Sequence, residues 1–212
     1  MKKNVFKSLT LVLTIALSGI VLTGCGGETT GSKDVQDAIS AAESGIPVVE
    51  SPVFGTLPSL LEQKLEAGTI LGKKFREMKT EDMDEAVKNK QLRDEAEDEL
   101  KAYYDEKIGA ASDALEGKNV KVEFDNSKIS AASVKLAVMD KTKGYFNFVF
   151  DVTPAQPVNK EVEFKWLFMD AEGNELESGS DYIVPGNKLN CEYMVTAGQD
   201  FIKKFDHLYL KY

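Results

Sequence analysis

The chain has 212 residues, of which 26 are basic and 35 acidic, and its formal net charge is −9. This length is enough for one or two domains with a real hydrophobic core. An acidic surface repels the phosphates of nucleic acids, so nucleic-acid binding is excluded as an expected function. The sequence has one histidine, His207, which argues against His-centred catalysis and against metal sites built from several histidines.

Residues 1–24 have the pattern of a secretory signal peptide. Lys2, Lys3 and Lys7 make a positively charged start, and an apolar run follows over residues 9–22. This run is shorter than the ~20 apolar residues that a membrane-spanning helix needs. The segment can belong to a lipoprotein signal peptide, and the two alternatives are an ordinary signal peptide without lipid attachment and an uncleaved membrane anchor.

The end of the run, Leu22-Thr23-Gly24-Cys25, resembles the bacterial lipobox. The resemblance implies that the thiol of Cys25 takes a diacylglycerol, that cleavage occurs before it, and that the new N-terminus can be acylated, with palmitate as the expected kind of chain. Two or three acyl chains hold a folded domain firmly on a membrane. The resemblance therefore predicts a protein anchored through lipidated Cys25 on the extracytoplasmic side of a cell membrane or outer membrane, with another envelope protein as its expected partner.

The mature chain would comprise residues 25–212, with 23 basic and 35 acidic side chains. If Cys25 is acylated, Cys191 has no cysteine left with which to form an internal disulfide. Cys191 lies in an alternating stretch that is typical of a strand. We expect a buried, inert thiol, because no nearby cation in the sequence would lower its pKa.

Residues 25–58 are expected to form a flexible tether. Three prolines and two glycines between residues 45 and 58 argue against regular structure there, and residues 33–44 have only a weak helical tendency. Some side chains are rather apolar for a free linker and are candidates to lie along a groove of the folded part: Val48, Val49, Val53 and Phe54.

Residues 59–117 are expected to form a helical hairpin. Apolar residues recur near a 3.6-residue period in both halves, and the clearer second helix spans residues 81–116, with Thr80 as N-cap and Gly117 as its stop. Its apolar stripe contains Leu92, Ala96, Leu100, Tyr103, Tyr104, Ile108, Ala111 and Leu115. The stripe is read as core, and the alternative is a coiled-coil-like partner surface that includes Leu100 and Tyr104.

From residue 118 the apolar period changes from 3.6 to 2. Seven short alternating segments with frequent turns over residues 118–212 predict an antiparallel, immunoglobulin-like β-sandwich. The expected fold class is therefore α+β, with an N-terminal helical hairpin followed by the sandwich.

One hairpin of this region resembles the FxLYD-type domain, a β-sandwich module of bacterial lipoproteins. The matching residues are Trp166, Leu167, Phe168, Met169 and Asp170, followed by the turn at residues 171–174, and a Pro-Gly turn precedes a strand at residues 185–186. Trp, Phe and Met stand where the family has Phe, Leu and Tyr. The resemblance covers at most residues 118–212 and implies a non-catalytic accessory module. Independently, Asp170 and Gly173 suit a tight turn.

No residues are assigned to catalysis, to a metal or to a cofactor. His207 is expected on a surface strand or loop, and residues 170–175 are read as a hairpin turn, because the glycine does not stand where a calcium loop requires it. The expected function is a non-catalytic binding or scaffolding module. Two alternatives remain open: a small-ligand or glycan binder with a pocket between helices and sandwich, lined by aromatics such as Trp166 or Tyr104, and a hydrolase with an unrecognised site.

Overall fold

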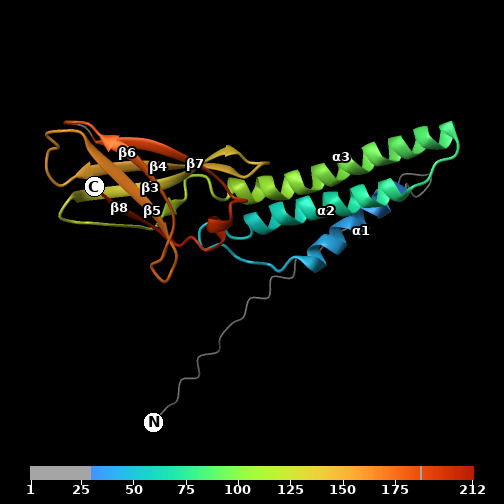
Figure 1. Cartoon of the computed structure of the whole chain (residues 1–212), viewed down its shortest axis with the longest axis horizontal. Helices are drawn as coiled ribbons and strands as arrows, with labels where there is room; N and C mark the ends of the chain where they lie inside the picture. The colour runs from blue at the N-terminus through green and yellow to red at the C-terminus, as the bar shows by residue number, and fades with distance from the viewer. Residues whose placement is uncertain (1–29, 187) are drawn as a thin grey trace, which may run out of the picture.

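The computed structural model describes residues 30–186 and 188–212. Three helices come first in the chain and two four-stranded sheets follow, so the fold class is α+β. The helices form an elongated bundle at one end of the molecule, and the sheets form the other end (Figure 1). No helix within the described ranges combines the length and the apolar composition that a membrane crossing requires.

The helical part is a bundle of three helices, one more than the predicted pair. Its members are α1 (Thr30–Gly45), α2 (Leu57–Glu77) and α3 (Met83–Asp113), and each helix contacts the other two. The additional helix α1 lies in the region that the sequence predicts to be a tether. Its buried residues recur at three and four positions, which gives it an apolar stripe that packs on the bundle: Val35, Ala38, Ile39 and Ala42.

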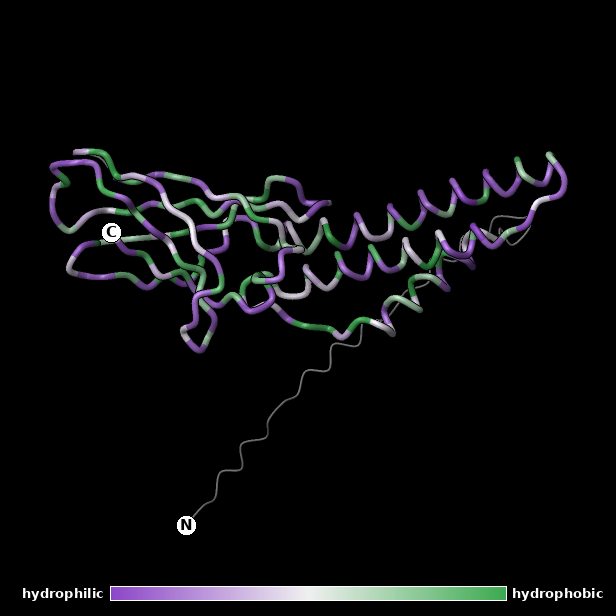
Figure 2. The backbone as a smooth tube through the Cα atoms, in the orientation of Figure 1, coloured by the Kyte–Doolittle hydropathy of each residue, from purple (hydrophilic) through white to green (hydrophobic). Residues whose placement is uncertain are grey.

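The long helix α3 follows the prediction, with small shifts at its ends. Its N-cap is Asp82, whose carboxylate accepts a hydrogen bond from the backbone N–H of Asp84 at 2.9 Å, and not Thr80. With 31 residues the helix is roughly 46 Å long. Figure 2 shows hydrophilic residues over much of its length, which fits a helix that buries a stripe and exposes its other side.

The connector between α1 and α2 closes one end of the sandwich. Val53 and Phe54 are buried, whereas Val48 and Val49 are exposed, so half of the expected groove-lining set packs inside. The ring of Phe54 stands edge-on to Phe146, with 5.0 Å between centroids. Phe54 therefore links the helical part to the sandwich in one continuous core.

The region after the helices contains eight strands in place of the seven predicted. Their bounds are β1 (Asn119–Val120), β2 (Val122–Phe124), β3 (Ile129–Asp140), β4 (Tyr145–Pro154), β5 (Val162–Met169), β6 (Glu175–Ile183), β7 (Leu189–Thr196) and β8 (His207–Lys211). The extra strand arises because the predicted first strand is divided at Lys121, where the chain passes from one sheet to the other.

The two sheets have the orders β1-β3-β4-β7 and β2-β8-β5-β6. All pairs are antiparallel except β2 with β8, which is parallel. The sheets meet through aromatic side chains, with Phe148 of β4 5.1 Å from Phe168 of β5 between ring centroids. The apolar residues that alternate along β4 are fully or almost fully buried, as expected for an inner face: Phe146, Phe148, Phe150 and Val152.

Candidate functional site

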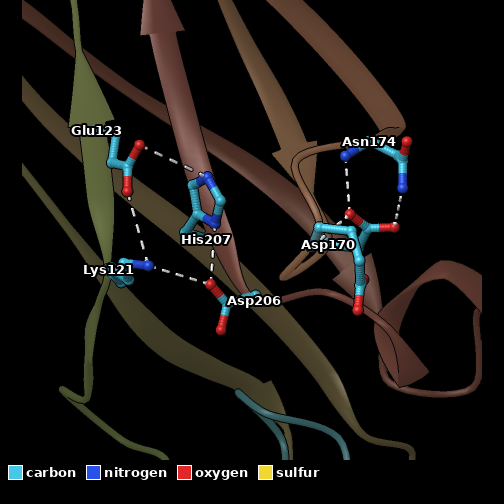
Figure 3. A network of polar contacts seen from close by, with 7 residues as sticks. Lys121, Glu123, Asp170, Asn174, Asp206 and His207 are labelled. Carbon is cyan, nitrogen blue, oxygen red and sulfur yellow. Dashed lines mark hydrogen bonds and ion pairs between the residues drawn. The ribbon is translucent and has the colours of Figure 1, made fainter.

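A small network of charged side chains lies where β2 and β8 run side by side (Figure 3). His207 Nδ1 lies 2.9 Å from Asp206 Oδ2, and its Nε2 lies 3.9 Å from Glu123 Oε2. Lys121 Nζ lies 3.2 Å from the same Asp206 oxygen and 3.6 Å from Glu123 Oε1. His207 was expected on the surface, but 8% of it is exposed. It is the buried member of a four-residue cluster.

The cluster fixes the point where the chain changes sheets. Lys121 is the residue between β1 and β2, and its carbonyl accepts a hydrogen bond from the N–H of Leu208 at 3.0 Å. The hydrogen bond with His207, followed by the ammonium of Lys121, lowers the pKa of Asp206. The acidic and basic groups pair with one another, so this arrangement is suited to holding the last strand, β8, against β2.

A second polar group holds the β5–β6 turn. The carboxylate of Asp170 accepts hydrogen bonds from the N–H of Glu172 at 3.0 Å and from the N–H and side-chain amide of Asn174 at 2.7 and 2.9 Å (Figure 3). Gly173 has a φ of 86°, so glycine is favoured there. These bonds, first those from Asn174, lower the pKa of Asp170. The roles predicted for Asp170 and Gly173 in a hairpin turn are confirmed.

The three residues predicted for a partner or ligand surface lie inside the molecule. Leu100, Tyr104 and Trp166 are 6%, 0% and 3% exposed. Leu100 and Tyr104 pack in the helical bundle, whereas Trp166 packs between the sheets, so they do not share a site. Burial, followed by the charge of Glu43, raises the pKa of Tyr104 to about 12. A partner can reach at most the edge of this set, through the groove that Leu100 lines.

Two of the hollows on the surface of the described region share Leu65 of α2, whereas two others, of about 350 and 360 Å³, lie farther along the α2–α3 pair and beside Tyr212. A groove of about 290 Å³ between α2 and α3 is lined by Lys64, Leu65, Gly68, Leu71, Glu97, Leu100 and Lys101. A hollow of about 340 Å³ at the junction of α2 with the sandwich is lined by Leu61, Lys64, Leu65, Thr142, Lys143, Tyr145, Thr196 and Gly198. Leu65 belongs to both and is 73% exposed. Leu65 is an apolar residue within the helical period of residues 59–78, and that period alone does not show that its side chain is exposed.

The remaining candidates are the Cys191 thiol, metal-binding clusters and the predicted lipidation site Cys25. Cys191 is only partly buried, not fully as expected, but burial, followed by the charges of Asp181 and Glu192, raises the pKa of its thiol to about 12, which fits the expected inert thiol. Over residues 30–186 and 188–212, no group of three or more His, Cys, Asp or Glu side chains is arranged to hold a metal ion. Cys25, the predicted lipidation site, precedes the described residues.

Comparison of the chain with protein-family models, with curated proteins and with solved structures finds no match in any of the three. The function must therefore be argued from the residues and the geometry alone.

Proposed function

We propose that this protein is a non-catalytic, lipid-anchored protein of the cell envelope that acts as a binding or scaffolding module on the extracytoplasmic side of a cell membrane or outer membrane. The observation that carries the proposal is the lipobox-like stretch of residues 22–25 directly after the apolar run of residues 9–22. Acyl chains on Cys25 supply the membrane attachment. No arrangement among the described side chains favours the hydrolase alternative.

The anchoring is tested by the fate of the two cysteines. We expect the wild-type protein and the control Cys191→Ala to partition into the detergent phase, with a mature N-terminus at Cys25 whose mass includes a diacylglycerol. The Cys25→Ala variant should stay unlipidated, because the acceptor thiol is gone. A wild-type chain that carries no lipid and partitions into water would overturn the proposal.

The surface around Leu65 is the best-supported place for a protein partner. Leu65 is an exposed leucine that joins the groove between α2 and α3 to the hollow beside the sandwich. Apolar side chains that line a continuous depression are typical of an interaction site. A photo-reactive amino acid at position 65 should form an adduct with an envelope protein in living cells. The matched control is position 66, whose glutamate is also exposed but points elsewhere on the helix; equal labelling at both positions, or none, would count against this surface.

A small-ligand or glycan binder is the second candidate, and the hollow at the junction favours it. Its volume of about 340 Å³ lies within the range of small-molecule sites, and Tyr145 offers an aromatic ring to a sugar. Envelope oligosaccharides should then raise the melting temperature of the wild-type protein and not that of Tyr145→Ala. An absence of any shift with the wild type would remove this candidate.

The same proposal takes residues 118–212 as an immunoglobulin-like module similar to the FxLYD type. The Asp170–Gly173 turn, the two facing sheets and the crossing of the first strand at Lys121 support this likeness. The strand order differs from that of antibody domains, because β3 and β4 form a hairpin within one sheet. An experimental structure of an FxLYD-type domain whose strand order differs from that of residues 118–212 would refute the proposed similarity.

A further inference from the structure

The end of the bundle farthest from the sandwich, where α2 passes into α3, exposes apolar side chains. Met78, Met83 and Val87 are 38%, 80% and 53% exposed. These three residues, named here the tip, lie within ten positions of one another. Figure 2 shows hydrophobic residues at this end of the bundle. Exposed apolar side chains that gather at one place are typical of a surface that contacts a protein or a membrane.

The start of α1 lies near the same end. Gly31 lies against α3, with the position of its missing Cβ 3.7 Å from the carbonyl oxygen of Leu92. Lys74, near the end of α2, forms an ion pair with Asp34 in the first turns of α1. Leu92 lies nine residues after Met83, so the tip extends about 14 Å beyond the start of α1.

The chain before α1 is too short to let the sandwich face the membrane. Four residues separate Cys25 from Thr30, and the five steps between these two residues span about 18 Å at most in a fully extended chain. If the bundle stands on its tip, the start of α1 lies about 14 Å from the membrane, which is within that span. If the sandwich faced the membrane instead, the 16 residues of α1 alone would hold Thr30 about 24 Å from it, and the chain could not reach.

The charge of this end is also compatible with a bilayer surface. Residues 73–93 contain seven basic and five acidic side chains, in a chain whose acidic residues otherwise prevail. Three of the five acids, Asp82, Asp84 and Glu85, lie at the start of α3, where the helix dipole offsets their charge. The tip itself, residues 78–87, has one basic and four acidic side chains, so apolar contact and not charge attraction would hold it on the bilayer, while the basic surplus lies in the helix turns behind it.

We infer that the tip docks on the lipid bilayer beside lipidated Cys25, so that the bundle stands as a spacer and the sandwich faces away from the membrane. This inference rests on the proposed lipid anchoring. It assigns the surface around Leu65, partway along the spacer, and the sandwich beyond it to partners that approach from outside the membrane.

The test uses the full lipidated protein in vesicles of phosphatidylcholine and phosphatidylglycerol, with brominated phosphatidylcholine as the quencher. Two variants each add one tryptophan at an exposed methionine: Met83→Trp at the tip and Met194→Trp on β7, where Met194 is 61% exposed. The native Trp166 is buried between the sheets and gives the same background in both. We expect the Met83→Trp variant to lose most of its added fluorescence and the Met194→Trp variant to lose none.

Two outcomes would overturn the inference alone. Lipidated, vesicle-bound protein with no quenching at position 83 would show that the tip stays in water, and equal quenching at positions 83 and 194 would show that the molecule lies along the bilayer. By contrast, a chain whose mass shows no lipid on Cys25 would refute the proposed anchoring itself, so the two failures are distinguishable.

Discussion

Removal of the Phe54 ring should test whether the connector joins the two halves of the molecule. Phe54 is 3% exposed and contacts Phe146 and Phe148, with ring centroids 5.0 and 6.2 Å away. The Phe54→Ala change removes a buried ring and leaves a cavity, which costs about 3–5 kcal/mol of unfolding free energy. For a chain of this size the melting temperature should fall by about 6–20 °C.

The assay is thermal and urea unfolding of the mature chain with Cys25→Ser, followed by circular dichroism. Val49→Ala is the matched control, because Val49 lies in the same connector but is 46% exposed, and its loss should change stability by less than about 0.5 kcal/mol. If Phe54→Ala costs no more than this control, Phe54 does not close the sandwich as described and the reasoning is refuted.

Two further changes test the sandwich. Gly179→Ala should destabilise the protein by about 1–3 kcal/mol, because the new Cβ would lie 2.6 Å from the indole of Trp166. The control Gly68→Ala in α2 places a Cβ that meets nothing within 4 Å, so it should stabilise the protein by about 1 kcal/mol. Urea unfolding in which both changes shift the stability in the same direction would contradict this packing. Asp170 has a lowered pKa in the fold, so its charge stabilises the protein above the unfolded-state pKa of about 4, and that contribution is lost as the pH falls toward the folded pKa. The stability gap between wild type and Asp170→Asn should therefore shrink from pH 7 to pH 3, while the exposed control Glu66→Gln should show a smaller change; a gap that is constant with pH would refute the role of the charge.

The difference between the predicted and observed N-terminal region has a physical cause. The apolar stripe of α1 consists of four residues, two of them alanines, so it is weak as a local signal, and a polar, glycine-flanked stretch of this kind resembles a tether. The helix is held by contacts with α2 and α3, residues far away in the chain. Tertiary packing supplies most of the stability of such a helix.

The sequence by itself determined the elements that have a clear period. The alternation around Phe148 made β4 a strand with one buried face, the three- and four-residue spacing around Leu100 made α3 a long helix, and Asp170 with Gly173 made a turn. Each of these follows from local geometry, because side chains repeat every 2 residues in a strand and every 3.6 in a helix.

Tertiary structure alone decided which apolar side chains stay outside and which strands meet. Leu65 and Met83 are large apolar residues of helices, yet both are exposed. The crossing of the chain at Lys121 likewise depends on the pairing of β2 with β8, which lies more than 80 residues later in the chain. His207 of β8 is buried because β2 lies beside it. Such contacts arise from long-range packing, to which no period in the sequence corresponds.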